Sequence, residues 1–397
     1  MRRSILFVIN GLGTGGSERS MAELLPWLQR AGIHIEVVCF YRRPEGVHEQ
    51  VVRQGIPVHN LTDRGLWGRV TGIRRRIREG RFGLLHTVHF EADLAGRLAA
   101  VGTGAKVMSS FVSTTYDPAR WSDPSVNPWK LRLVRGIDGW TARHLSHHFH
   151  AVSQAARDSN VRALRLDPDR VTVVHRGRDP ERLGVRNPER RLRILDALEL
   201  EPDSRILLHV GRQEYAKGLP VLLQAVAPVL RSDPRRVLLQ AGREGHETPG
   251  LQRLFRQLGL GSRCRMLGHR EDVPDLLAAA DVFVFPSLYE GLPGALIEAL
   301  AVGLPVVASD LPSVREVVEH GANARLVPPG RPGPLTSALE TLLQDRELAA
   351  GYGRTSRRIF LDRFTLERSA TSMLALYDRL LPGQPDPTSE PRSGVTS

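Results

Sequence analysis

Short runs of apolar residues alternate along the chain with longer amphipathic segments. The apolar runs are continuous, as in residues 4–10 (SILFVIN) and 204–211 (SRILLHVG). Continuous apolar strands separated by helices are typical of parallel sheets covered by helices on both faces. The pattern predicts strands over residues 4–10, 34–40, 56–61, 82–88, 105–111, 147–153, 170–175, 204–211, 235–242, 262–268, 281–286 and 304–310. We therefore expect an α/β protein.

The predicted strands fall into two groups separated by a charged segment, residues 177–204, that contains three prolines. A chain of 397 residues is too long for one ordinary core, and such a segment is typical of a linker. We expect a doubly wound, Rossmann-like domain over 1–180, a second over 190–360, a helix over 361–381 and a disordered Pro/Ser-rich tail over 382–397. Ligands of such sheets bind at the carboxyl ends of the strands, which would face each other across a cleft.

The charge of the chain is strongly asymmetric. The net charge is +12, and residues 1–180 alone hold 27 Lys and Arg against 16 Asp and Glu. An anionic membrane face, an acidic substrate or nucleic acid would suit this excess, unless arginine-rich usage is only a compositional habit. Aromatic residues make up 6%, too few to interleave with the basic residues, so we expect no nucleic-acid partner.

Cysteine usage and hydropathy favour a cytoplasmic protein. Only two cysteines occur, Cys39 and Cys264, so no disulfide framework is predicted. No apolar run approaches the roughly 20 residues that a membrane helix requires. The basic and apolar start of the chain ends in a glycine-rich turn after Ile9, and we interpret it as a first strand and not as a leader peptide.

A glycine-rich loop follows the first predicted strand. Residues 11–16 (GLGTGG) match the G-x-G-x-x-G pattern of dinucleotide-binding loops. That site also requires an acid at the end of the second strand, where Arg42 and Arg43 stand, although Glu36 lies inside the strand. An NAD(P)-dependent enzyme is one interpretation. The more general one is that amides at a helix start approach an anion closely, and the alternative is a tight turn capped by Ser17.

Two glutamates interrupt the apolar segment 287–310 (SLYEGLPGALIEALAVGLPVVASD). On one helix, Glu290 and Glu298 would be rotated about 80° from each other around the helix axis and separated by about 12 Å along it. At that separation they could not act together as a catalytic acid and base. Pro293 suits the first turn of a helix, so we place Glu290 on a loop and Glu298 inside the helix. Free amides between them suit an anion or a sugar, with the carboxylates accepting from hydroxyl groups. The alternative is that Glu298 complements the helix dipole and Glu290 faces water.

Residues 210–220 (VGRQEYAKGLP) place Arg212 and Lys217 on a loop after another strand. Arginine binds phosphate in a bidentate manner and lysine acts as a point charge, although both could be ordinary surface cations. The two segments together place hydrogen-bond donors for phosphate and hydrogen-bond acceptors for a diol at one edge of a sheet. A site for a nucleotide sugar requires both.

These segments together resemble the retaining GT-B glycosyltransferases of family 4, also called group 1. In the back half the resemblance rests on residues 210–225, 267–318 and 324–330, and in the front half, more loosely, on residues 10–18, 86–100, 149–158 and 171–179. It implies two Rossmann-like domains facing across a cleft, the N-terminal one binding the acceptor and the C-terminal one the nucleotide sugar.

The resemblance also implies residue roles. Glu298 would bind the donor ribose, and Arg212 and Lys217 would neutralise the diphosphate. The transferred hexose would be held by Glu290 with the amides of Gly291, Leu292 and Gly294, the base would lie near His269 and Arg270, and the diphosphate would also be approached by Gly15 and Gly16. Glu290, Arg212 and Lys217 are the implied catalytic residues.

The implied reaction moves a hexose from a UDP- or GDP-linked donor to a glycan or lipid-linked acceptor, with retention of configuration and without a metal or another cofactor. It would serve bacterial polysaccharide or glycolipid synthesis. A nucleotide-sugar epimerase, an NAD(P)-dependent enzyme and a non-catalytic family member are the alternatives. An epimerase or an NAD(P)-dependent enzyme would need catalytic acids in the cleft or the acidic residue that binds the dinucleotide. A non-catalytic member would lack some of the charged residues that bind the nucleotide sugar.

One departure from the family concerns the acceptor side. Many relatives carry a histidine after the fifth strand of the front half, where this chain has Val112 and Ser113. His86 and His89, one strand earlier, are candidate substitutes, unless both merely pack at a strand end.

A basic segment, residues 64–81 (RGLWGRVTGIRRRIREGR), predicts a contact with an anionic membrane. It holds seven arginines and one acid, and its Leu66, Val70, Ile73 and Ile77 recur at helical spacing. That stripe would pack on the sheet and leave the arginines facing water or lipid. We therefore expect a cytoplasmic protein that is either soluble or peripheral on the inner face of the cell membrane.

Overall fold

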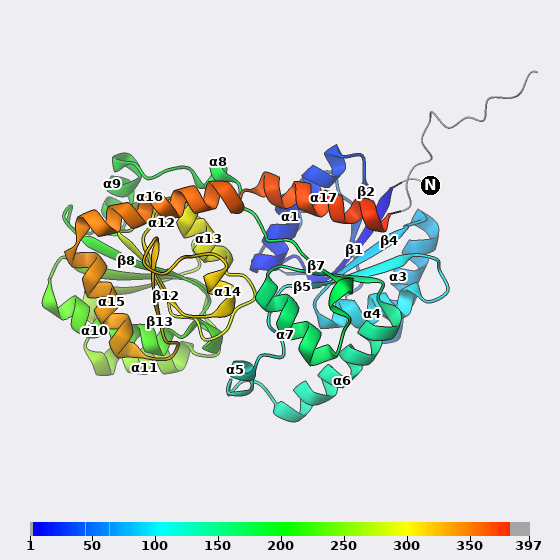
Figure 1. Cartoon of the computed structure of the whole chain (residues 1–397), viewed down its shortest axis with the longest axis horizontal. Helices are drawn as coiled ribbons and strands as arrows, with labels where there is room; N and C mark the ends of the chain where they lie inside the picture. Colours follow the sequence, from blue (N-terminus) through cyan, green and yellow to red (C-terminus); the bar gives the residue numbers. More distant parts are fainter. Residues whose placement is uncertain (1–2, 44, 63, 382–397) are drawn as a thin grey trace, which may run out of the picture.

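The computed structural model describes residues 3–381 apart from residues 44 and 63, so the predicted tail over 382–397 lies outside the described residues. Two α/β domains lie side by side, each built on a parallel sheet (Figure 1). Their carboxyl strand ends meet at the domain boundary, which confirms the expected GT-B architecture of two Rossmann-like domains.

The N-terminal sheet has the order β3-β2-β1-β4-β5-β6-β7. Its strands are β1 (Ser4–Gly11), β2 (His34–Tyr41), β3 (Val58–Asn60), β4 (Leu84–Val88), β5 (Lys106–Phe111), β6 (His148–Ala151) and β7 (Val171–Val173). The central β1 is buried along nearly its whole length, as its continuous apolar run requires. The predicted strands are all present, although β3, β6 and β7 are each three residues shorter than expected.

The C-terminal sheet has the order β10-β9-β8-β11-β12-β13. Its strands are β8 (Arg205–Val210), β9 (Arg236–Ala241), β10 (Cys264–Gly268), β11 (Val282–Phe285), β12 (Val306–Ser309) and β13 (Ala324–Val327). The edge strand β13 was not predicted, because its four residues include Arg325 and carry no continuous apolar run.

Helices cover both faces of both sheets (Figure 1). In the N-terminal half they are α1 (Gly16–Arg30), α2 (His48–Arg53), α3 (Leu66–Gly80), α4 (Phe90–Ala100), α5 (Pro118–Trp121), α6 (Pro128–Leu145) and α7 (Gln154–Leu164), with a 3₁₀ turn at Pro168–Arg170. In the C-terminal half they are α8 (Pro180–Leu183), α9 (Pro188–Ala197), α10 (Leu219–Ser232), α11 (Thr248–Leu258), α12 (Val273–Ala279), α13 (Gly294–Ala301), α14 (Pro312–Arg315), α15 (Pro332–Gln344), α16 (Arg346–Arg363) and α17 (Leu366–Leu380), with 3₁₀ turns at Tyr215–Lys217 and Gly261–Arg263.

Half of the segment expected as a linker is helical. Asn187 caps α9, and Ile194 and Leu195 on this helix belong to the core of the C-terminal domain. Prolines at the first position of α8 and α9 start these helices, so the prolines mark helix starts and not an extended connection.

The stretch predicted as one helix over 361–381 contains the end of α16 and all of α17, with Thr365 capping α17. Figure 1 shows α17 continuing from the C-terminal domain onto the N-terminal one. Its Met373, Leu376 and Tyr377 pack in the N-terminal core with α1 and β1. The N-terminal domain is therefore completed by residues more than 180 positions beyond its last strand.

The two crossings between the domains are paired with each other. Arg178 donates its amide to the Phe364 carbonyl at 2.9 Å and accepts from the Leu366 amide at 2.8 Å. A Cβ on Gly177 would overlap the Thr365 carbonyl, so this close approach requires glycine.

Candidate functional site

A cavity of about 590 Å³ lies between the domains, at the carboxyl ends of strands from both sheets. It is lined by all eleven residues that the sequence assigned to a donor: Gly15, Gly16, Arg212, Lys217, His269, Arg270, Glu290, Gly291, Leu292, Gly294 and Glu298. These residues span 284 positions of sequence, and the fold brings them to one place. We call this space the donor cavity.

The glycine-rich loop forms one wall of the donor cavity. Gly15 occupies the N-cap of α1, so the alternative cap at Ser17 is wrong. A Cβ on Gly16 would lie 2.9 Å from Nη1 of Arg176, which shows how closely this backbone approaches the guanidinium. The loop thus places helix-start amides beside a buried cation, an arrangement that binds anions.

Arg176 is a candidate site residue that the sequence reasoning missed. It is 9% exposed and lines the donor cavity, and its buried Nε has no hydrogen-bond partner among the described residues. Burial, with the neighbouring charge of Arg178, lowers the pKa of Arg176 to about 10. A buried guanidinium without a paired carboxylate is costly unless an anion neutralises it. The two arginines of the HRGRD segment, residues 175–179, were the available signal.

Glu298 is 4% exposed and lies inside α13, as predicted. Its Oε1 accepts from Nε of Arg178 at 2.7 Å, and Nη1 of Arg19 lies 3.7 Å away. Burial by itself would raise the pKa of Glu298, but Arg178 and Arg19 lower the pKa overall, so the carboxylate is ionised. Oε2 makes no hydrogen bond to a described residue and remains free to accept from a ligand hydroxyl.

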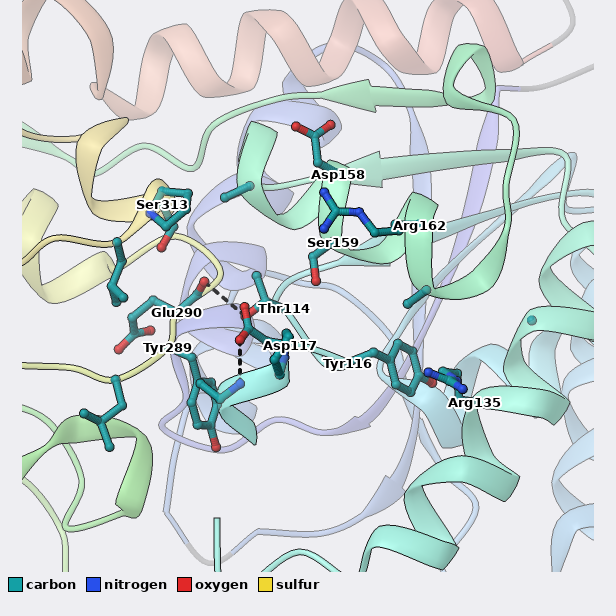
Figure 2. A pocket seen from close by; sticks show the side chains of 18 of the residues that line it. Thr114, Tyr116, Asp117, Arg135, Asp158, Ser159, Arg162, Tyr289, Glu290 and Ser313 are labelled. Carbon is teal, nitrogen blue, oxygen red and sulfur yellow. Dashed lines mark hydrogen bonds between the residues drawn. The ribbon is translucent and has the colours of Figure 1, made fainter. Parts of the chain in front are cut away.

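Glu290 lies on the loop between β11 and α13, as predicted. Its Oε1 accepts from Nζ of Lys217 at 2.6 Å and from Ser287 at 2.9 Å. The Glu290 carbonyl faces Thr114 of the N-terminal domain, whose hydroxyl lies 3.4 Å away (Figure 2). The Glu290–Lys217 pair therefore sits where the two domains meet.

The loop after Glu290 is pressed against the N-terminal domain. Ser153, the N-cap of α7, donates its hydroxyl to the Gly291 carbonyl at 2.6 Å. A Cβ on Gly291 would overlap the Val112 carbonyl, so the approach requires glycine. Val112 and Ser113, which stand where relatives carry a histidine, line the donor cavity at this contact.

Arg212, His269 and Arg270 form the outer rim of the donor cavity. Arg212 is largely exposed, and its Nη1 lies 3.7 Å from Glu214. Arg270 binds Asp272 through two hydrogen bonds of 2.8 and 2.5 Å. Its guanidinium is thus already neutralised, which leaves the exposed His269 the freer of the two side chains for a ligand base.

The two candidate histidines of the acceptor side have different places. His89 lines the donor cavity, where its Nε2 lies 3.2 Å from the Ser17 hydroxyl, and burial lowers its pKa. His86 does not line the donor cavity. It is buried at the centre of a chain of hydrogen bonds, and its role on the acceptor side stays a prediction.

That chain runs from Tyr377 through His86, Ser110 and His150 to the Val174 carbonyl, with distances of 2.7, 2.6, 2.8 and 3.0 Å. The carbonyl can only accept, so His150 carries its proton on Nε2 and accepts from Ser110 at Nδ1. Ser110 in turn accepts from Nε2 of His86, whose Nδ1 accepts from Tyr377. Both histidines are therefore neutral, and burial lowers the pKa of His150 to about 4. The chain fastens α17 to the sheet.

Within residues 3–381, apart from 44 and 63, no group of three or more His, Cys, Asp or Glu side chains is arranged to hold a metal ion. No helix in the same residues combines the length and the hydrophobicity needed to cross a bilayer.

The two halves of the chain match two family models. Residues 14–182 match the family described as Glycosyltransferase Family 4, and residues 191–359 match the family described as Glycosyl transferases group 1.

Individual relatives agree with these models. The chain is 27% identical over 251 residues to the alpha-D-kanosaminyltransferase of Streptomyces kanamyceticus, covering 62% of this chain and 64% of that protein, which is less than two thirds of its length. It is 28% identical over 315 residues to the alpha-maltose-1-phosphate synthase of Mycobacterium tuberculosis, covering 75% and 79%. The structure of Anabaena Alr3699/HepE in complex with UDP-glucose shares the fold, with a TM-score of 0.82 at 22% identity over 95% of this chain and 99% of that one.

Proposed function

The chain belongs to the group 1 glycosyltransferases of the GT-B fold, enzymes that transfer sugars, and from that premise we propose that it moves a hexose from a nucleoside diphosphate sugar to a glycan or lipid-linked acceptor with retention of configuration. The membership removes the epimerase and NAD(P)-dependent alternatives. We further propose that the reaction belongs to polysaccharide or glycolipid synthesis.

The observation that carries the proposal is the meeting of cations, carboxylates and free amides in one cavity. Arg176, Arg212 and Lys217 supply positive charge for a diphosphate, with the Gly15–Gly16 amides opposite. Oε2 of Glu298 has no hydrogen-bond partner among the described residues and would accept from a ribose hydroxyl. The UDP-glucose in the Anabaena structure supports a donor of this class.

In the proposed reaction, the nucleoside diphosphate is the leaving group and its negative charge grows as the glycosidic bond breaks. Lys217 and Arg212, together with Arg176, stabilise that charge from fixed positions, which is electrostatic catalysis. Glu290 holds the ammonium of Lys217 in place and, with the amides of the following loop, accepts from and donates to the hexose hydroxyls. His269 lies at the rim, where the base would stack or bond.

A thermal-shift panel of UDP- and GDP-linked hexoses tests the donor proposal. A ligand that binds only the native state at a concentration of 100 times its Kd raises the free energy of unfolding by about 2.7 kcal/mol. We expect one nucleotide class to give such a shift, and release of that nucleoside diphosphate when an acceptor is added. NADPH is the control for the dinucleotide interpretation, and a shift with NADPH alone would contradict the proposal.

The membrane contact also remains a proposal, but the structure changes the segment that carries it. In α3, Arg69 donates to Glu91, Arg74 donates to carbonyls at the end of α4, and Arg76 pairs with Glu36. Three of the seven arginines of residues 64–81 therefore hold the N-terminal domain together, and the other four are exposed. Leu66, expected to be buried, is 38% exposed.

Helix α6 presents a better surface for a bilayer. Its Trp129, Leu133, Ile137 and Trp140 are 76%, 65%, 38% and 55% exposed and recur at helical spacing. Asp138, the single acid of the helix, is buried against Arg97, whereas four Lys and Arg side chains of α6 are exposed. Tryptophan and basic residues along one helix suit an anionic interface.

Sedimentation with liposomes tests this surface. We expect pelleting that requires anionic lipid, falls as salt rises, and is lost in a Trp129→Ser/Trp140→Ser variant. Trp67→Ser is the matched control, because Trp67 is 71% exposed on α3. If only the Trp67→Ser variant lost pelleting, α3 and not α6 would be the membrane-binding helix. Pelleting with neutral lipid alone would refute the role of anionic lipid.

A further inference from the structure

A second and larger cavity, of about 990 Å³, adjoins the donor cavity. Tyr289 and Glu290 line both spaces, so the two cavities meet where the proposed hexose would lie (Figure 2). The other walls of the larger space come mainly from α6 and α7 of the N-terminal domain. Because a transfer reaction needs donor and acceptor side by side, this larger space is the place for the acceptor. We call it the acceptor cavity.

Five arginines line the acceptor cavity: Arg132, Arg135 and Arg143 on α6, Arg162 on α7, and Arg165 at the end of α7. Three of them have partners in the protein, and for Arg135 the partner is the ring of Trp121, 5.8 Å away. Arg143 donates to the Leu164 carbonyl at 2.6 Å, and Arg132 lies over the rings of Trp121 and Trp129.

The acids of this cavity are already engaged. Asp117 caps α5 by accepting from the Ala119 amide at 2.8 Å. Asp158 accepts from Gln154 and lies 3.3 Å from Arg157. Glu290 pairs with Lys217. Positive charge on the opposite wall is therefore not neutralised by these carboxylates.

Arg135, Arg162 and Arg165 have no carboxylate within 4.0 Å among the residues that the structure describes. Figure 2 shows Arg162 pointing from α7 toward the loop of Glu290, and Arg135 beside Tyr116 on the far wall. All three side chains are exposed to solvent at the wall of one space, and an anion there would be attracted by each of them.

Resting on the proposed function, we propose that the acceptor carries a phosphate group, which Arg135, Arg162 and Arg165 hold while its hydroxyl reaches the hexose at Glu290. A phosphomonoester carries between one and two negative charges and three acceptor oxygens, and it can therefore bind several guanidinium groups at once. A carboxylate carries one charge and two oxygens, and two arginines would suffice for it. The cavity has room for a group larger than a monosaccharide.

Calorimetry with defined probes tests the phosphate site. Glucose 6-phosphate is the soluble probe, glucose the neutral control, and glucuronate the carboxylate control. A second arm uses phosphatidic acid in phosphatidylcholine vesicles, with phosphatidylglycerol in phosphatidylcholine at equal charge as its control, because the α6 surface proposed above would bind any anionic lipid. Binding of glucose 6-phosphate indicates a soluble acceptor, and binding of the phosphatidic acid vesicles alone indicates a lipid-borne one.

We expect Arg135→Gln and Arg162→Gln each to weaken binding of the phosphate probe about tenfold or more, because a hydrogen bond to a charged group is lost. Arg78→Gln is the control, since Arg78 is exposed on α3 and does not line the acceptor cavity. The thermal shift with the nucleotide sugar should be unchanged in all three variants, so that a failed donor proposal and a failed acceptor proposal give different results.

Equal binding of glucose 6-phosphate and glucose, with no preference for phosphatidic acid vesicles, would overturn the proposal. So would stronger binding of glucuronate, or full phosphate binding in both glutamine variants.

Discussion

Replacing Glu298 by glutamine should destabilise the protein before any ligand is added. The substitution keeps the size of the side chain but removes the charge that faces Arg178, which is 1% exposed and 2.7 Å away. Breaking a buried ion pair costs about 3–5 kcal/mol, because one charge stays buried without its partner. Arg178 also donates to Ser20 and lies 3.6 Å from Glu23, so we expect the lower end of that range.

A loss of about 3 kcal/mol corresponds to a fall in Tm of roughly 6–12 °C for a domain of 150–250 residues. The measurement is thermal unfolding of Glu298→Gln beside the wild type at pH 7. Glu201→Gln is the matched control, because Glu201 is exposed on a loop. A midpoint for Glu298→Gln equal to that of Glu201→Gln would refute the reasoning.

The pH dependence has a definite sign. The pKa of Glu298 is lowered in the fold, so its contribution is complete above the unfolded value near 4.3 and is lost as pH falls through the lower folded value. The stability of wild type and variant should therefore converge in acid. A constant difference down to pH 3 would contradict the charge as the cause.

A second substitution separates stability from binding. Adding Arg178→Met to Glu298→Gln removes the unpaired guanidinium and should recover much of the lost Tm, while Arg182 still pairs with Glu23 at 3.0 Å. The thermal shift with the nucleotide sugar should stay reduced, because the ribose acceptor is still missing. If the double variant recovered both the Tm and the thermal shift with the nucleotide sugar, Glu298 would not be part of the donor site.

Three other predictions follow from the same structure. Lys217→Ala should lower turnover more than it weakens donor binding in calorimetry, because the charge it faces grows as the bond breaks; equal losses would mean that it only anchors the ground state. Gly291→Ala should push the domains apart through overlap with the Val112 carbonyl, visible as a larger radius in X-ray scattering and lower activity, whereas unchanged scattering would contradict the contact. Tyr377→Phe should cost about 1–3 kcal/mol and expose α17 to hydrogen exchange, because His86 loses its donor, and protection equal to wild type would show that the buried chain does not hold the helix.

The sequence predicted the fold well because the signal is local. Each continuous apolar run, such as that of β1, requires burial on both faces and so identifies its own strand. The strand that was not predicted, β13, is an edge strand whose four residues include the half-buried Arg325. The docking of α17 could not be predicted, because an amphipathic pattern shows that a helix packs but not on which domain.

The sequence predicted those site residues that belong to a recognisable motif. It did not predict those whose place in the site depends on a residue far away in the sequence. The eleven donor residues come from loops with glycines and charges at recognisable spacing, and they line one cavity. Arg178 lies 120 positions before Glu298, and no motif in either segment predicts that the two side chains form an ion pair. Arg176 was not predicted for the same reason, since its role depends on burial against the glycine-rich loop. The exposed tryptophans of α6 were missed because exposure depends on neighbouring elements.

The position of α17 has a consequence for how the protein is made. Strand β7 ends at Val173 and α17 begins at Leu366, so a ribosome that adds 5–20 residues per second needs roughly 10–40 s to pass from one to the other. During that interval the first domain has all its strands but lacks the helix that covers Phe7 and Met21. Its newly formed core would stay partly open to chaperones and to other nascent chains, and the second domain would fold before the first one closes. The first domain to be synthesised is thus the last to be completed.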